Sequence, residues 1–495
     1  MIRDKIAKFI SSNREYPVLF GLATGIQPLL YLYDSNFNMV NSWPQFLFLA
    51  SFFIAIPIAV FLLLSFLLKV LKASANFKSK MFSVLNFCLF TFFVGYVTFG
   101  IQKRLLLITL LVAVCILAII FYKHLKKVVV FQLLLAVLVL VKLTPSLYYF
   151  VQYSYEWQEP KDDIKNVVFK KRPNIYYLQP DGYVDFNILT SGYYAFEDMG
   201  METFLEDNGF RIYNDFRSNY TSTLTSNSSM FSMKHHYYYA YLNSDRFYNS
   251  RQIITGKNPV IDIFKNNDYH TNLILDAPYL VTNRPNILYD YCNLDYDEIA
   301  YLPRGFEFEK DTKEALFKAM ENKVGSKSSF YFVRQPYPGH IQTRPTESKG
   351  KEEERSAYLQ DLKTSNEWLR IVIREINQKD PNSIIVISSD HGGYVGYDYM
   401  RESYIKTTDE DLIQSTFSSL LAVKWPTQEV PDYENTLKSS VNLFRVLFAY
   451  LAEEDHYLQN LEPDISYGRI RQQAPEGVYE LINEKGEVVF NKISK

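Results

Sequence analysis

Asp181, Asp390 and His391 each come shortly after a short apolar run in the polar part of this 495-residue chain, which begins near residue 156. The two runs cover residues 174–178 and 383–387, and their length predicts buried strands. Polar side chains at the carboxyl ends of parallel strands meet at one edge of an α/β sheet, so we expect these three side chains to converge. Carboxylate oxygen and imidazole nitrogen are ligands of zinc and manganese. The pattern predicts a site for one divalent metal ion, zinc or manganese first, with calcium or magnesium as alternatives.

A hydroxyl and a second histidine extend this set. Thr221 opens a hydroxyl-rich segment at residues 221–229, and His340 lies in a Pro-Gly-His loop just beyond the apolar run 329–333. A hydroxyl that joins two carboxylates and an imidazole around a metal ion has a lowered pKa and becomes a nucleophile at neutral pH. If the segment opens a helix, its first N–H groups favour a phosphate or sulfate anion. These residues therefore predict metal-assisted attack on a phosphate or sulfate ester.

Each feature alone also has an ordinary structural explanation. Asp181 and the glycine after it form a common turn pair, and hydroxyl-rich segments such as 221–229 are most often loops or helix caps. Residues 219–221 match a glycosylation acceptor, and a lone histidine such as His340 in a Pro-Gly loop is typical of a surface. The Asp-His-Gly-Gly run at 390–393, which follows a buried strand, is the feature that such explanations fit least well.

Strands and helices must position these residues, and they are predicted by an alternation of short apolar runs and helical stretches after residue 172. This alternation is typical of an α/β domain with a mostly parallel sheet sandwiched by helices. We expect this domain to cover residues 172–455, followed by a C-terminal segment at 456–495. The predicted elements are strands at 174–178, 271–275, 329–333 and 383–387, helices at 201–208 and 358–376, and a hairpin at 478–482 and 488–491.

Five apolar segments precede this domain, and each is long enough to be a membrane span. A cleaved signal peptide is a single short apolar stretch, so five in succession predict a transmembrane domain over residues 1–150. A tyrosine-rich and charged juxtamembrane linker at 151–171 follows. The first segment is short and interrupted by two prolines. The predicted spans cover residues 16–33, 45–68, 81–102, 105–122 and 128–150.

The orientation follows from the lysines and arginines of the short loops. Residues 3–14, 69–80 and 123–127 together carry eleven of them, whereas the opposite loops carry only Lys103 and Arg104. Positive loops stay in the cytoplasm, so the amino terminus is predicted to be cytoplasmic. Five spans then send the polar half to the outer, periplasmic side of the cytoplasmic membrane. If the first segment does not span, the polar half is cytoplasmic instead.

The composition excludes some classes of protein. The net charge is −2, which gives no basic face for a nucleic acid. The chain has three cysteines, and two of them lie in apolar segments, so the polar half has no disulfide framework and no Cys-x-x-Cys metal motif. The sequence leaves protein partners open.

The order of the motifs resembles the sulfatase-like branch of the alkaline phosphatase superfamily, over about residues 172–451. The segment 173–182 is similar to the family's first strand, which ends in a metal-binding acid, and the Asp-His-Gly run at 390–392 matches a metal-binding motif of the family. Residues 417–426 resemble the strand that follows it. Five spans before such a domain are similar to the layout of lipoteichoic acid synthases and lipid A phosphoethanolamine transferases.

This resemblance implies a set of site residues. In the membrane enzymes a threonine is both the nucleophile and a metal ligand. The Thr-Ser-Thr run at 221–223, with Met-Phe-Ser at 230–232, resembles their version of that motif and implies Thr221 as the catalytic nucleophile. His340 would contact the transferred phosphate group or a second metal. The implied metal ligands are Asp181, Thr221, Asp390 and His391.

The resemblance also implies a reaction, in which a phospho-substituent such as phosphoethanolamine or phosphoglycerol passes from a membrane lipid donor to an envelope glycan or lipid. Two alternatives stay open, namely a sulfatase-like hydrolase of sulfate or phosphate esters and a catalytically inactive membrane-bound binding or assembly protein.

Three departures from the family pattern bear on this choice. Residues 221–230 lack the Cys/Ser-x-Pro-x-Arg setting of sulfatases proper, which argues against sulfate ester hydrolysis by that route. Asp181 stands where the membrane transferases usually carry glutamate. No histidine occurs between His391 and His456, so a second-zinc histidine has no clear counterpart, and one metal ion is expected.

Overall fold

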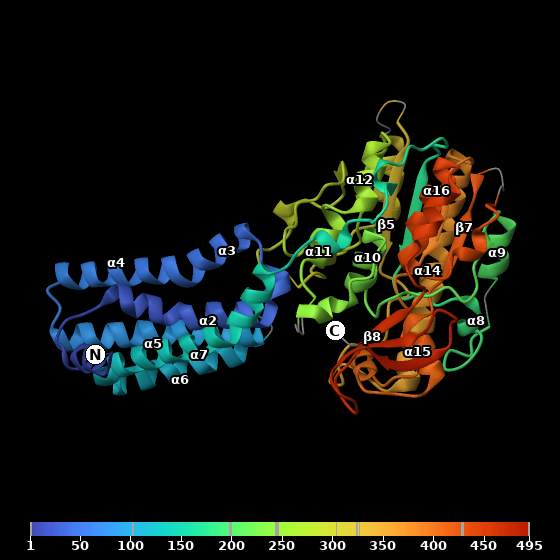
Figure 1. Ribbon diagram of the computed structural model, residues 1–495. Coiled ribbons are helices and arrows are strands. Elements are labelled where there is room, and N and C mark those ends of the chain that lie inside the picture. The colour runs from blue at the N-terminus through green and yellow to red at the C-terminus, as the bar shows by residue number, and fades with distance from the viewer. Residues whose placement is uncertain are drawn as a thin grey trace. The chain divides into compact units, whose positions relative to one another are not determined.

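The computed structural model describes residues 2–100, 103–197, 200–242, 247–302, 304–322, 325, 327–426 and 430–493. The chain divides into two compact units (Figure 1). The first comprises Met1–Tyr153 with Ala300–Pro303, and the second comprises Ser154–Ile299 with Arg304–Lys495. The finer domain boundaries predicted at residues 150, 171 and 455 stay predictions.

The first unit is helical over most of its length. A π-helical turn at Ser51–Ala55 joins two of its helices, α3 and α4, into one segment. Its helices are α1 (Ile2–Ser11), α2 (Pro17–Val40), α3 (Trp43–Ala50), α4 (Ile56–Val70), α5 (Ala75–Phe99), α6 (Arg104–Ile120) and α7 (Leu125–Val151).

Among the described residues, three helical segments of this unit are long and apolar enough to cross a membrane. They are Trp43–Val70, Ala75–Phe99 and Tyr122–Val151. The predicted spans 45–68, 81–102 and 128–150 fall on them, although residues 101 and 102 lie outside the described residues. The predicted first and fourth spans fall on α2 and on the 17-residue α6, which are not among the three. The count of five spans stays a prediction.

Small residues and one ion pair let α2 pack closely within this unit. A Cβ atom on Gly25 would lie 1.5 Å from the carbonyl oxygen of Phe53, and Gly21 makes a similar close approach one turn earlier. Such small residues at a spacing of four allow helix backbones to approach each other in membranes. The ammonium group of Lys142 on α7 lies 2.6 Å from the carboxylate of Asp34 on α2. The one charge within the predicted span 128–150 is therefore paired inside the unit.

The second unit is built around a seven-stranded sheet with the spatial order β2-β7-β6-β1-β5-β3-β4. Only β7 runs against the other strands, since β6 and β2 both pair with it in antiparallel fashion and the remaining pairs are parallel. The mostly parallel sheet predicted from the sequence is therefore confirmed. In spatial order, the strands are β2 (Arg211–Ile212), β7 (Leu421–Lys424), β6 (Ile384–Ser388), β1 (Ile175–Pro180), β5 (Ser329–Gln335), β3 (His270–Ile274) and β4 (Tyr291–Cys292).

Helices cover both faces of this sheet (Figure 1). Alternate residues of β1 point to opposite faces, with Tyr177 packed in one core cluster and Tyr176 in the other. α10, α12 and α16 contribute to the first cluster, and α9, α13 and α14 contribute to the second. The helices of the unit are α8 (Phe186–Leu189), α9 (Met201–Asp207), α10 (Thr223–Ser232), α11 (Ser250–Thr255), α12 (Pro259–Asn266), α13 (Thr312–Glu321), α14 (Lys351–Lys379), α15 (Glu410–Phe417) and α16 (Leu443–Ala452).

The predicted elements agree with this sheet to within a few residues. The four predicted strands correspond to β1, β3, β5 and β6, and the helix predicted at 201–208 corresponds to α9. The helix predicted at 358–376 is most of the buried part of α14, which begins seven residues earlier, at Lys351, with an acidic first turn. The predicted C-terminal hairpin is β9 (Gly477–Ile482) and β10 (Val488–Lys492), and β8 (Ser466–Ile470) adds a third strand to it.

Gly182, in the turn after β1, allows two loops at this edge of the sheet to touch. Its φ is +66°, and a Cβ atom would lie 2.0 Å from the carbonyl oxygen of Gly339. Left-handed backbone costs an L-residue roughly 1–2 kcal/mol and overpacking roughly 1–3 kcal/mol more, so we expect Gly182→Ala to lower the free energy of unfolding by about 3 kcal/mol.

The matched control for this prediction is Gly200. It has a φ of +71°, and no described atom lies within 4 Å of the position of its Cβ. Gly200→Ala should therefore cost only the backbone term of about 1 kcal/mol. Urea unfolding followed by fluorescence compares the two variants, and equal losses would show that the close approach to Gly339 does not matter.

Candidate active site

Asp181 and Asp390 are brought together by two neighbouring parallel strands. β1 pairs with β6 in parallel register, from Ile175 opposite Ile384 to Leu178 opposite Ile387. Asp181 follows the last residue of β1, and Asp390 comes two residues after the end of β6. The two carboxylates therefore lie at the same edge of the sheet, as the sequence predicts, and both side chains are buried.

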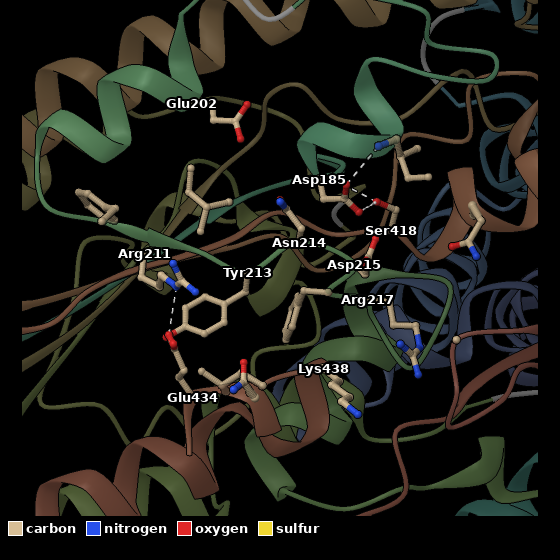
Figure 2. Close-up of a pocket in the computed structure, with 18 of the residues that line it drawn as sticks. Asp185, Glu202, Arg211, Tyr213, Asn214, Asp215, Arg217, Ser418, Glu434 and Lys438 are labelled. Carbon is tan, nitrogen blue, oxygen red and sulfur yellow. Dashed lines mark hydrogen bonds and ion pairs between the residues drawn. The ribbon is translucent and has the colours of Figure 1, made fainter. Parts of the chain in front are cut away.

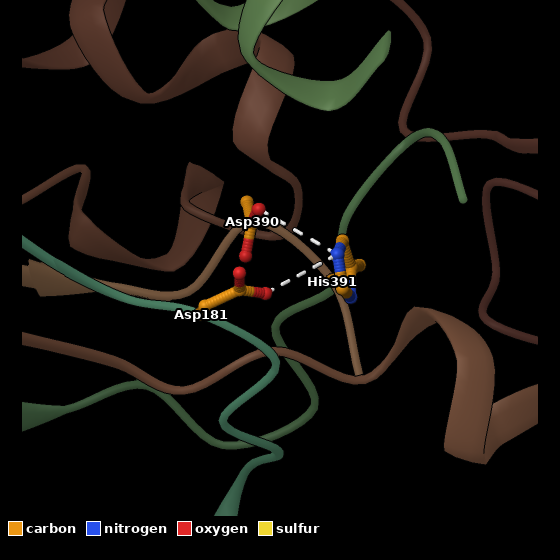
Figure 3. Close-up of side chains that lie close together, drawn as sticks. All are labelled: Asp181, Asp390 and His391. Atoms are coloured by element: carbon orange, nitrogen blue, oxygen red, sulfur yellow. Dashed lines mark ion pairs between the residues drawn. The ribbon is translucent and has the colours of Figure 1, made fainter. Parts of the chain in front are cut away.

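His391 faces these two carboxylates (Figure 3). Its Nε2 atom lies 3.5 Å from Oδ1 of Asp181 and 3.6 Å from Oδ2 of Asp390. One ligand atom from each of the three residues lies within 4.8 Å of the other two. The structure thus brings together three of the four predicted metal ligands.

The backbone around His391 holds its ring in this orientation. Nδ1 lies 2.8 Å from the carbonyl oxygen of Gly392, to which it donates, and this leaves the lone pair of Nε2 directed at the carboxylates. Gly392 must be small here, since a Cβ atom would lie 2.1 Å from the carbonyl oxygen of Ser415. The glycine of the Asp-His-Gly motif is therefore explained by close packing.

The two carboxylate oxygens nearest to His391 suit a bound cation. Oδ1 of Asp181 and Oδ2 of Asp390 are buried and make no hydrogen bond with any described residue. Burial and, after it, the negative charge of Asp390 raise the pKa of Asp181 above its ordinary value. Buried, unpaired carboxylate oxygens are costly without a positive charge between them. Together with an imidazole nitrogen they form a donor set that fits a divalent metal ion.

Arg334, at the end of β5, compensates part of this negative charge. Its guanidinium forms a buried ion pair with Oδ2 of Asp181 and a second one with Oδ1 of Asp276, at 2.6 Å. Burial lowers the pKa of Arg334, but the two carboxylates outweigh this effect and raise it above the ordinary value. Arg334 therefore stays charged and holds Asp181 by the oxygen that does not face His391.

The hydroxyl that reaches this cluster is that of Thr223, not that of Thr221. Thr223 is the first residue of α10, and its Oγ1 atom lies 3.5 Å from Nε2 of His391. The Oγ1 atom of Thr221 instead lies 3.0 Å from the hydroxyl of Tyr238, and its carbonyl oxygen accepts a hydrogen bond from Tyr394. No hydrogen bond joins the Thr221 side chain to a described metal-ligand candidate. The structure thus leaves Thr221 outside the cluster in which the sequence predicted it.

His340 lies beside the cluster, as expected. The centres of its ring and the ring of His391 are 5.8 Å apart, and the side chain is exposed. Its Nδ1 atom donates to the carbonyl oxygen of Ile341 at 2.7 Å, and this directs the other ring nitrogen away from the backbone. The amide of Gly339 donates to the carbonyl oxygen of Asp181 at 2.8 Å, which fixes the loop against the turn after β1.

The sequence analysis missed three residues of this site. Arg334 continues the buried apolar run 329–333, and a charged residue in such a place signals a buried partner. Asp276 follows β3 and meets the same strand-end criterion that identified Asp181. Thr223 carried no separate signal, because both threonines of the 221–223 run are suitable at the start of a helix.

A family model and several solved structures are similar to this chain. The family model for sulfatases matches residues 203–451, half of the chain. The zinc complex of the C-terminal periplasmic domain of EptC from Escherichia coli is 13% identical, with a TM-score of 0.41, and the match covers 66% of this chain and 95% of that one. The lipoteichoic acid synthase LtaP from Listeria monocytogenes is 14% identical, with a TM-score of 0.41, and the match covers 66% and 91%.

The integral membrane protein EptA from Neisseria meningitidis, a lipooligosaccharide phosphoethanolamine transferase, is 12% identical, with a TM-score of 0.40, and the match covers 88% of this chain and 95% of that one. No curated protein sequence matches the chain. The family-model match includes Thr223, Asp390 and His391 and ends within α16. The chain belongs to the sulfatase family, within the alkaline phosphatase superfamily.

Proposed function

We propose that this protein is a membrane-bound, metal-dependent transferase that moves a phospho-substituent, such as phosphoethanolamine or phosphoglycerol, from a lipid donor to an envelope glycan or lipid. The observation that carries the proposal is the approach of the Thr223 hydroxyl to His391, at 3.5 Å, beside two buried carboxylate oxygens that no described residue satisfies. A nucleophile, a metal donor set and a helix amino terminus meet there.

In this proposal Thr223 takes the nucleophilic role that the sequence had assigned to Thr221. Asp181, Asp390 and His391 would hold the metal ion, with the Thr223 oxygen as the fourth ligand. When bound, the metal supplies positive charge that lowers the pKa of the coordinated hydroxyl and stabilises charge on the phosphoryl oxygens. We propose zinc or manganese, because the donor set combines carboxylates with an imidazole.

The amino terminus of α10 is arranged to receive a phosphoryl oxygen. The N-cap residue is Ser222, whose side chain hydrogen-bonds to the hydroxyl of Thr225 at 2.8 Å and caps no described backbone N–H group. The first N–H groups of a helix have no partner within the helix and attract anions. These groups are therefore suited to stabilise the negative charge that develops beside Thr223 during transfer.

The proposed reaction has two displacements at phosphorus. In the first, the Thr223 hydroxyl loses its proton and its oxygen forms a bond to phosphorus while the ester bond to the donor lipid breaks, and the departing lipid oxygen takes up that proton. In the second, a hydroxyl of the acceptor loses its proton and attacks the phospho-threonine, and the leaving Thr223 oxygen takes up that proton. His340, whose second ring nitrogen is directed away from the backbone, would contact the phosphoryl group or carry a proton between these oxygens.

The apolar segments would keep this site near its lipid donor. The three segments that can span a membrane, together with the predicted spans on α2 and α6, would anchor the second unit on the outer side of the cytoplasmic membrane, as the eleven positive residues of the opposite loops predict. The donor would then be captured by diffusion in the plane of the membrane.

The intact mass of the detergent-purified protein, incubated with envelope phospholipids, tests this proposal. We expect an added mass that is absent from Thr223→Ala and present in Thr221→Ala, and its size identifies the transferred group. A protein that carries no adduct, yet cleaves soluble phosphate or sulfate esters with metal bound, would be a hydrolase instead. A protein with neither adduct, activity nor bound metal would be a binding or assembly protein.

A further inference from the structure

Arg334 is buried between two carboxylates at the carboxyl edge of the sheet. It lies in β5, which runs between β1 and β3 and is parallel to both. Asp181 directly follows β1, and Asp276 comes two residues after the end of β3. Because the carboxyl ends of neighbouring parallel strands meet at one edge, the two aspartates reach Arg334 from the strands on either side of it.

Each terminal nitrogen of the guanidinium holds one carboxylate. Nη2 pairs with Oδ2 of Asp181, and Nη1 lies 2.6 Å from Oδ1 of Asp276. The side chains of Arg334 and Asp276 are each 3% exposed. Oδ2 of Asp276 and Nε of Arg334 are buried and make no hydrogen bond with any described residue. The cation and its two anions are therefore almost out of contact with solvent, where charges act on each other most strongly.

The two oxygens of Asp181 face two different positions for a cation. Oδ1 lies 3.5 Å from Nε2 of His391, on the side of the proposed metal ion, whereas Oδ2 faces Arg334. In two-metal sites a second cation lies beside the first. Such a second ion would need Oδ2 of Asp181 and a further carboxylate, and Asp276 is the carboxylate at that place. Both are held by the guanidinium instead.

The charges of this centre balance with one divalent ion. The carboxylates of Asp181, Asp276 and Asp390 carry three negative charges when they are ionised. Arg334 and one divalent ion supply three positive charges, and a neutral His391 adds none. A second divalent ion beside the guanidinium would leave two positive charges in excess among buried groups, which is costly.

We propose that Arg334 is a positioning residue that takes the place of a second metal ion. It limits the centre to one divalent ion and holds Asp181 so that only Oδ1 is offered to that ion. A guanidinium does not lose its proton in proteins, so this second positive charge is present at every concentration of metal. The inference rests on the metal centre of the proposed function, but the number of bound ions is measured without turnover.

Two other arginines of this unit each hold a single carboxylate and provide a comparison. Arg445 forms a buried ion pair with Asp162. Arg211 pairs with Glu434 at 3.2 Å in the wall of a polar pocket at the β2 edge of the sheet (Figure 2). Neither pair includes a residue of the metal-ligand cluster. Loss of either arginine frees a carboxylate without changing the surroundings of the proposed metal ion.

The number of zinc ions bound per chain tests the proposal, measured by equilibrium dialysis of the full-length protein in detergent. We expect one ion in the wild type and in Arg334→Lys, which keeps the positive charge. We expect two in Arg334→Ala, because Oδ2 of Asp181 and the carboxylate of Asp276 are then free to hold a second ion. Combining Arg334→Ala with Asp276→Asn should return the number to one, because a ligand of the second ion is lost.

The matched controls are Arg445→Ala, for a buried pair, and Arg211→Ala, for a more exposed one. Both should stay at one ion. The single variant Asp276→Asn gives a second measurement that does not remove the guanidinium. It leaves the charge of Arg334 on Asp181 alone and should weaken the first zinc ion about tenfold, as for other residues that orient a metal ligand.

One ion in a folded Arg334→Ala would overturn the proposal, as would two ions in the wild type or a second ion in either control. If Arg334→Ala does not fold, Asp276→Asn decides, and an unchanged zinc affinity would overturn the proposal. A wild type that binds no zinc, manganese or other divalent ion would overturn the metal centre of the proposed function as well.

Discussion

The Asp390→Asn variant should purify as a folded protein without its divalent metal and without activity. Asp390 supplies one of the two buried carboxylate oxygens that face Nε2 of His391, and the amide that replaces it carries no charge. Replacing a residue that only hydrogen-bonds to a metal ligand already lowers the metal affinity about 10- to 100-fold. Replacing the ligand itself should therefore lower the metal affinity at least about a hundredfold. Metal content by mass spectrometry and turnover of a phospholipid donor, measured on one preparation, check this result.

A matched control for this variant is Asp185→Asn. Asp185 is also a buried carboxylate at the same edge of the sheet, but it caps α8 by accepting from the amide of Ile188 at 3.1 Å. Asparagine is an equally good N-cap, so this variant should keep its metal and its stability. Full metal content in Asp390→Asn would mean that the cluster is not the metal site, and loss of metal in both variants would point to a general effect of charge.

The Thr223→Ala variant should lose about 10⁴-fold in turnover, whereas Thr221→Ala should lose less than about tenfold. Removing a nucleophile typically costs four to six orders of magnitude, because the remaining groups only bind and polarise the substrate. The hydroxyl of Thr221 forms a hydrogen bond with the hydroxyl of Tyr238, which is outside the cluster. Single-turnover kinetics with a phospholipid donor, under metal saturation, separate the chemical step from binding.

Thr223→Ser provides the conservative variant, since it keeps the attacking oxygen and should retain measurable turnover and the covalent adduct. Thr221→Ser should be close to the wild type. If Thr221→Ala shows the larger loss, the amino terminus of α10 must adopt another arrangement with substrate, and the sequence-based assignment of the nucleophile would be the better one.

Much of the fold was predictable from local pattern. The strands β1, β3, β5 and β6 are short, apolar and separated by helical stretches, and a strand buried on both faces must have this composition. β2 and β4 have only two residues each and leave no such signal. β8 escaped prediction because its residues, Ser-Tyr-Gly-Arg-Ile, contain no apolar alternation and are held by pairing with β9.

The candidate site also has residues that the local sequence predicts and residues that only the tertiary structure places. Asp181, Asp390 and His391 follow short buried strands. Neighbouring parallel strands place the residues that follow them at one edge, so the sequence by itself determined this cluster. The proposal of Thr223 in place of Thr221 rests on the tertiary structure alone. The two threonines are two residues apart. Which one faces His391 depends on where α10 begins and on the hydrogen bonds of Thr221 with Tyr238 and Tyr394.

Two buried arginines, Arg334 and Arg217, show most clearly why some contacts cannot be predicted from local sequence. The local sequence around each of them does not indicate its partners, which are set by the tertiary structure. Arg334 forms ion pairs with Asp181 and Asp276, more than fifty residues away in each case. Arg217 donates to the carbonyl oxygens of Asp464 and Asn483, more than two hundred residues away. Periodicity and strand ends are local properties, so the sequence determined the strands and the convergence of Asp181, Asp390 and His391. The partner of a buried charge is set by long-range packing, and only the tertiary structure decided it.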